Sequence, residues 1–115
     1  EQGSIEYDSK GLFFTPASNR YHLGMWGYVA KTAAYTLTDD DYTVDITANS
    51  NTYTLPTAVG RTGRVFIIMN SGVGAPVVDP SGAETIAGAS TYTMAASRGI
   101  IIQSTGANWI VISAQ

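Results

Sequence analysis

The residues of this 115-residue chain that could do chemistry are few and scattered. His22 is the single histidine and there is no cysteine, so the sequence offers neither a recognisable Ser-His-acid motif nor the ligands of a zinc site. Asp39, Asp40 and Asp41 form the densest acidic run. An EF-hand calcium loop needs alternating ligands and a glycine at its sixth position, which this run lacks. We therefore expect a solvated turn here and predict no metal site.

Two other sets of residues resemble parts of catalytic motifs. Asp79 and Glu84 could form the carboxylate pair of a glycoside hydrolase, which requires a separation of about 5 to 9 Å. The stretch GRTGR at 60–64 lacks the Gly-Lys-Ser/Thr ending of a phosphate loop. We expect Asp79 and Glu84 to stabilise a turn, and Arg64 to bond a loop carbonyl or to form a salt bridge at a strand edge. The sequence thus predicts no catalytic residue and no cofactor.

Composition and charge exclude several classes of protein. Six Lys and Arg residues are scattered through a chain of net charge -3, whereas a nucleic-acid binder needs clustered cations. The longest apolar runs are about four residues, far below the roughly 20 that span a bilayer, so no membrane insertion is expected. A hydrophobic content of 44% argues against disorder. Because the chain begins at Glu1 without an initiator methionine, we expect it to be part of a longer protein.

The elements that must position these residues are predicted to be strands. Short runs rich in Thr, Val, Ile and Tyr recur between clusters of Gly, Asn, Asp and Pro, which is typical of an all-β sandwich or barrel. We predict an N-terminal β-hairpin and a connector in residues 1–30, a short helix over 29–33, a linker at 31–34, and a small antiparallel β-sandwich of about eight strands at 35–115. The strands of the sandwich are expected at 35–37, 42–46, 51–55, 64–70, 75–79, 90–94, 99–103 and 108–113.

The last two strands are apolar on both faces. Since side chains alternate between the faces of a sheet, bulky groups at consecutive positions require a cover on each side. We expect one face to fill the core of the chain and the other to contact further copies. The predicted interface consists of Ile100, Ile101, Ile102, Trp109, Ile110 and Ile112.

The segments YTLTDDDYTV, TYTLPTAVGRTGRVFIIMNSG, DPSGAETIAGASTYTM and STGANWIVI resemble a β-rich module near the C-termini of bacteriophage tail fibres and related virion fibre proteins. The preceding GSIEYDSKGLFFTPASNRYHLG is similar to the short hairpin segment upstream of such modules. The resemblance implies a non-enzymatic structural protein of the virion, in its tail or a fibre. It further implies a homotrimer whose distal part attaches to a glycan or protein receptor on the host surface.

Loops are the parts of such a module that solvent and receptor can reach. The predicted receptor-binding residues are Ser71, Gly72, Asp79, Ser81, Ser97, Arg98 and Asn108. Trp26 and Tyr28 are expected to fill the joint between the hairpin and the sandwich. Three other interpretations fit the same sequence: a capsid-attached head fibre or decoration protein, a carbohydrate-binding module of a secreted protein, and a depolymerase fragment.

Overall fold

The computed structural model describes residues 4–8, 11–15, 21–22, 27–48 and 50–115, with side chains from Gly27 onward. Every regular element within these ranges is a β-strand, which confirms the all-β class. Within the same ranges there is no helix that is both long and apolar enough to span a membrane.

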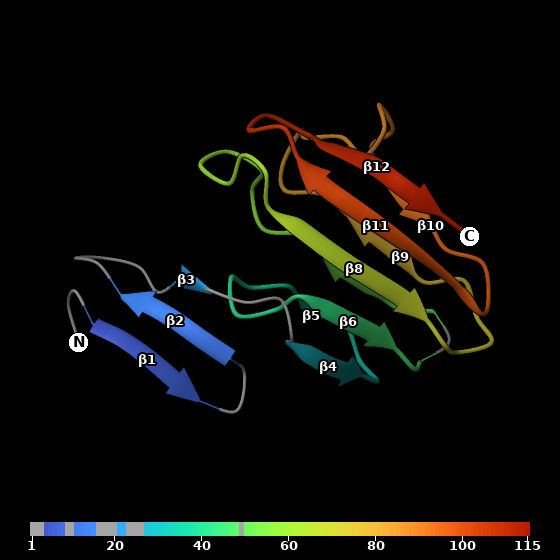
Figure 1. The fold of residues 1–115 in the computed structure, drawn as a ribbon. Helices are drawn as coiled ribbons and strands as arrows, with labels where there is room; N and C mark the ends of the chain where they lie inside the picture. The colour runs from blue at the N-terminus through green and yellow to red at the C-terminus, as the bar shows by residue number, and fades with distance from the viewer. Residues whose placement is uncertain (1–3, 9–10, 16–20, 23–26, 49) are drawn as a thin grey trace.

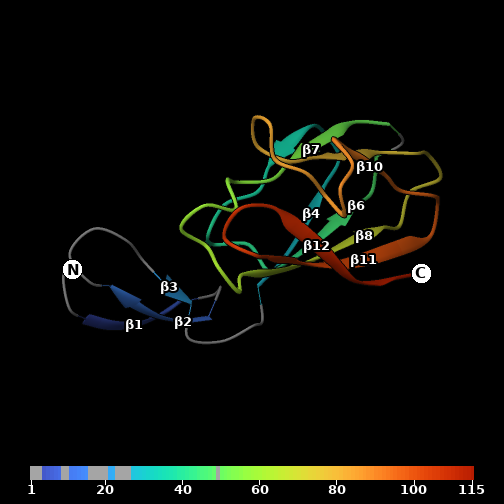
Figure 2. The same ribbon diagram turned by 90° about the horizontal axis from the view of Figure 1, so that it is seen from above.

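The N-terminal part of the chain forms a small sheet of its own. Strands β1 (Ser4–Asp8) and β2 (Gly11–Thr15) pair antiparallel with Asp8 opposite Gly11, which confirms the predicted hairpin. A third strand, β3 (Tyr21–His22), adds to β2. Figures 1 and 2 show this sheet to one side of the remaining strands.

The remaining nine strands build two sheets that lie face to face (Figure 2). The larger sheet has the order β12-β11-β8-β6-β4, and the smaller has the order β10-β9-β7-β5. The strands of the larger sheet are β4 (Tyr28–Lys31), β6 (Thr43–Ile46), β8 (Val65–Asn70), β11 (Arg98–Ser104) and β12 (Trp109–Ala114). Those of the smaller sheet are β5 (Tyr35–Thr36), β7 (Thr52–Thr54), β9 (Val77–Asp79) and β10 (Tyr92–Thr93).

From β4 to β9 the chain alternates between the two sheets. Each strand therefore runs in the same direction as the strand that entered its sheet before it. As a result the pairs β4/β6, β6/β8, β5/β7 and β7/β9 are parallel. Strands β10, β11 and β12 then close the two sheets with antiparallel pairs. The prediction of a two-sheet fold is confirmed, but the prediction that it is antiparallel is wrong, since both sheets are mixed.

Strand β4 corrects a second prediction. The residues expected to form a short helix include Val29, which instead lies in a strand parallel to β6 and packs against the core. The larger sheet thus begins at Tyr28, inside the segment expected to be a connector. Lys31, the first residue of the expected linker, is the last residue of β4, and residues 32–34 connect the two sheets.

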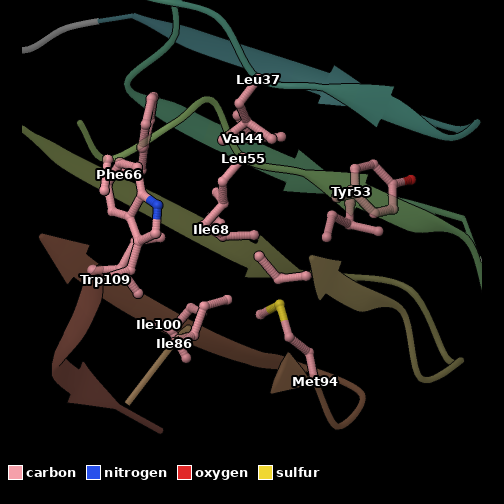
Figure 3. Packing of buried hydrophobic residues seen from close by; sticks show 14 residues of the cluster. Leu37, Val44, Tyr53, Leu55, Phe66, Ile68, Ile86, Met94, Ile100 and Trp109 are labelled. Carbon is pink, nitrogen blue, oxygen red and sulfur yellow. The ribbon is translucent and has the colours of Figure 1, made fainter. Parts of the chain in front are cut away.

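Fourteen buried hydrophobic side chains fill the space between the sheets (Figure 3). Trp109 and Phe66 lie together at one side of this core with ring centroids 5.6 Å apart, and Tyr53 lies at the other side and is equally inaccessible to solvent (Figure 3). Ile86 comes from the long connection between β9 and β10 and pairs with Trp109 in an isolated bridge. The core therefore fixes this connection as firmly as it fixes the strands.

Candidate functional site

The loops lie at two opposite ends of the sandwich. We call proximal the end where Gly27 leads into β4, which contains loops 37–42, 55–64, 80–91 and 105–108. We call distal the end that contains loops 32–34, 71–76 and 94–97. Figures 1 and 2 both place β1–β3 beside the proximal end and the C-terminus at the distal end. The predicted receptor-binding residues are divided between the ends, so no single surface contains them all.

A network of charged residues joins the proximal loops. Arg61 forms a salt bridge to Asp39, with Nε 2.8 Å from Oδ1 and a second bond of 3.0 Å to Oδ2. Arg64 donates hydrogen bonds to the carbonyl oxygens of Asp39 and Asp41, and its guanidinium lies 4.4 Å from the Phe66 ring centroid. The expected role of Arg64 as a donor to loop carbonyls is therefore confirmed.

The acidic run is a turn between two strands, as expected, but it is solvated only in part, since Asp39 is exposed and Asp41 is buried. It connects β5 and β6, and Asp41 is only 7% exposed. Its carboxylate accepts hydrogen bonds from the Tyr35 hydroxyl (2.7 Å) and the Thr38 backbone N–H (2.8 Å). These donors satisfy the buried carboxylate, so Asp41 holds the loop in place from within.

The pKa values of this network follow from its contacts. Hydrogen bonding from Arg61 lowers the pKa of Asp39. Burial, and then the hydrogen bond to Asp41, raise the pKa of Tyr35 to about 12. Burial lowers the pKa of Arg64, against the attraction of the neighbouring aspartates. Each of these shifts thus comes from burial or from a neighbouring residue of the same network.

Glu84 belongs to a separate contact between loops. Its carboxylate accepts hydrogen bonds from the Thr57 hydroxyl and the Ala58 backbone N–H. Burial raises the pKa of Glu84, but these bonds outweigh it and the pKa is lower than usual. The buried indole N–H of Trp109 adds to this lowering, although it lies outside ordinary hydrogen-bond geometry. The hydrogen-bond partners of Glu84 are thus on loop 55–64.

The other predicted residues of the proximal end also support the fold. The Asn108 side-chain oxygen accepts a 2.8 Å hydrogen bond from the Thr85 backbone N–H, which ties loops 80–91 and 105–108 together. The Ser81 carbonyl accepts a bond from the Glu84 backbone N–H. These contacts leave Asn108 and Ser81 less available to a receptor than their loop positions suggested.

At the distal end a single buried amide organises the loops. The Asn70 side chain is fully buried and donates 2.9 Å hydrogen bonds to the carbonyls of Gly74 and Ala95. Its oxygen accepts a bond from the Gly72 backbone N–H, and a Cβ at Gly72 would lie 2.7 Å from the Ala48 carbonyl oxygen. Gly72 is therefore structural. Our sequence reasoning missed Asn70, although a polar residue that ends the apolar run VFIIM is a signal for such a role.

The remaining predicted residues of the distal end are more accessible. Ser71 is exposed and donates a 2.6 Å hydrogen bond to Asp45 Oδ1. Ser97 adopts a positive φ of 56° in an exposed turn, and the Arg98 side chain is exposed beside it. Val73, at the tip of loop 71–76, is 83% exposed. Arg98 has no hydrogen bond or ion pair to any side chain that the structure describes.

The predicted trimer-interface residues lie on two different faces. Ile100, Ile102 and Trp109 are at most 2% exposed and belong to the core of the chain itself, so they cannot contact another copy. Ile110 and Ile112 are 41% and 55% exposed, and Ile101 is half-buried on the same outward face. The structure adds three half-buried outward residues from β8 to this set: Val65, Ile67 and Met69.

No group of three or more acidic, His or Cys side chains that could hold a metal ion occurs in the described part of the chain. His22 is on β3, before the region whose side chains are described, and Trp26 lies outside the described residues. Tyr28 is 66% exposed and donates to Asp45 Oδ2 (2.9 Å), so its expected role in filling a joint is wrong.

In comparisons with known proteins, no family model and no curated protein matches the chain.

Proposed function

We propose that the chain is a non-enzymatic structural module of a virion fibre, the distal segment of a trimeric phage tail fibre that takes part in trimerisation and attachment to the host surface. The sequence resemblance supports the location in a virion and the assembly of three copies into a trimer. The structural observation that carries the proposal is the outward face of the larger sheet. We call this the apolar face and define it by its residues on β8, β11 and β12: Val65, Ile67, Met69, Ile101, Ile110 and Ile112.

The residues of the apolar face lie on three adjacent strands, and two polar residues lie among them: Gln103 is paired with both Val65 and Ile110, and Ser113 is paired with Ile101. Ile101 is paired with Ile67 on one side and lies beside β12 on the other. No charged residue occupies an outward position within this patch. A largely apolar exposed patch on a sheet is unusual for a monomer and marks an interaction surface. Stacking against another sheet would remove it from water.

The outward face of the smaller sheet has the opposite character. Strand β9 contributes Val77 and Asp79 to this face. The other three strands contribute four threonines: Thr36, Thr52, Thr54 and Thr93. Hydroxyl groups on a sheet surface are well solvated, so this face needs no cover. The contrast favours an assembly in which the larger sheets face one another and the smaller sheets face solvent.

Light scattering on the purified chain tests the assembly, and three times the chain mass of 12.2 kDa is the expected result. A folded monomer would contradict it, and a monomer with measurable glycan affinity would favour a carbohydrate-binding module instead. Attachment is tested by pull-down with susceptible bacteria, and labelling of intact particles distinguishes a tail fibre from a head fibre.

A further inference from the structure

Charge is unevenly divided between the two ends of the sandwich. The distal end and the strand ends beside it carry Lys31, Arg98 and Asp45, a side-chain sum of +1. The proximal end carries two arginines and five acids, a sum of -3: Arg61, Arg64, Asp39, Asp40, Asp41, Asp79 and Glu84. Among the side chains that the structure describes, the distal end therefore carries a small positive charge and the proximal end a negative one.

The two distal cations lie on one row across the larger sheet. Lys31 is paired with Ile46, Ile46 with Asn70, and Asn70 with Arg98. Three steps between strands separate the two cations, which corresponds to about 14 Å between their backbones. Loop 71–76, whose exposed tip is Val73, begins on the same row directly after Asn70.

The charged side chains at and beside this row differ in how far they are already engaged by other residues of the chain. Arg98 is exposed and makes no side-chain bond within the described region. Lys31 Nζ lies 4.0 Å from the Tyr35 ring centroid, a cation–π contact that positions the ammonium without neutralising it. Asp45 is occupied by Tyr28 and Ser71.

We propose that the distal end binds an anionic glycan, in which carboxylate or phosphate groups contact Arg98 and Lys31 and sugar hydroxyls contact the surrounding Ser, Thr and Gly backbone. The inference rests on the proposed function and names the class of its ligand. Two separated cations are too few for nucleic acid, which needs clustered Lys and Arg. They can contact two acidic groups of one glycan chain. The distal end is also the end opposite to β1–β3, where a host surface could be reached.

The test measures binding of the whole chain to immobilised dextran sulfate, with uncharged dextran of equal length as the reference. Wild type should bind only the sulfated polymer, and binding should weaken as salt is added. Arg98→Gln and Lys31→Gln should each weaken binding by roughly two- to five-fold, the size of an exposed ion pair. Arg98→Lys should retain most of the binding.

Arg20→Gln is the matched control because it removes the same charge from the N-terminal segment. An equal loss in this variant would show that net charge alone drives binding and would overturn the proposal. The absence of binding to dextran sulfate would overturn it too, as would equally tight binding to a DNA duplex of similar charge. A wild-type trimer that binds bacteria but not the polyanion refutes this inference and leaves the proposed function intact. A chain that binds the polyanion but neither trimerises nor binds bacteria refutes the proposed function alone.

Discussion

At the scale of single residues, the loops of this molecule are held by a few hydrogen-bonded polar side chains, of which Asn70 and Asp41 are buried and Glu84 is half-buried. Asn70 joins two distal loops, Asp41 closes the connection between β5 and β6, and Glu84 links loop 80–91 to loop 55–64. Removing one partner of a buried hydrogen bond costs more than the bond itself contributes, because the other partner is left unsatisfied. Loop geometry should therefore depend on a few identifiable side chains.

Asn70→Asp tests this dependence because it keeps the shape of the side chain and removes its two donated bonds. The carbonyls of Gly74 and Ala95 would then face a carboxylate instead of an amide N–H. We expect a loss of about 2 to 4 kcal/mol in the free energy of unfolding, measured with urea. Thr91→Ala, at an exposed position, is the control and should change stability by less than about 0.5 kcal/mol. Equal stability of the two variants would refute the role of Asn70.

Glu84 should make stability depend on pH in the acid range. Its pKa is lower in the folded chain than its ordinary value of 4.5. Its contribution is therefore present above pH 4.5 and is lost as the pH falls through the folded-state pKa. Glu84→Gln should destabilise the chain by about 1 to 2 kcal/mol at pH 7, because charge-assisted bonds become neutral ones. Melting temperatures at pH 7 and pH 3 check this: the difference between wild type and variant should shrink at pH 3, and a constant difference would contradict it.

At the scale of elements, the positions of strands could be predicted from the sequence and their directions could not. Each of the eight strands expected after residue 34 overlaps an observed one, because alternation and turn residues are local signals. Direction depends on which sheet the chain enters after each loop, and an inward Val44 or Ile68 is equally compatible with a parallel or an antiparallel neighbour. Strand β4 was missed because its small residues show little alternation of polarity, and its pairing with β6 overrides this weak local preference.

Strand β4 leads to a prediction about the smallest unit that folds. From the sequence we expected the sandwich to begin at residue 35, so a fragment 35–115 represents that boundary. That fragment lacks β4, which would leave β6 at an open edge and remove the contact of Val29 with the core. A fragment 27–115 should therefore melt clearly above a fragment 35–115 in circular dichroism. Equal melting temperatures would show that β4 is dispensable and that the boundary expected from the sequence is the correct one.

At the scale of the whole molecule, the two sheets differ in what they present to solvent. Sequence reasoning recognised that β11 and β12 are apolar on both sides, yet it could not say which residues face outward. Alternation along each strand separates the two faces, with Ile101, Ile110 and Ile112 on one and Ile100, Ile102 and Trp109 on the other, but it does not say which face is turned to the core. Three of the six predicted interface residues consequently belong to the core. The outward residues of β8 escaped notice because their run reads as a buried strand.

Ile110→Asp is the direct test of the apolar face as an interface between copies. Ile110 is 41% exposed in the single chain, so an aspartate there would be solvated in a monomer and should leave its fold intact. In an assembly through the apolar face the same carboxylate would be buried without a partner, at a cost of several kcal/mol for each copy. We therefore expect the mass measured by light scattering to fall from three chains to one while the circular dichroism spectrum is unchanged. Thr93→Asp places the same charge on the smaller sheet and should keep the mass of the wild type. If Ile110→Asp remains a trimer as Thr93→Asp does, the interface between copies does not include β12. That result would contradict the assembly proposed here, and the apolar face would then contact another partner.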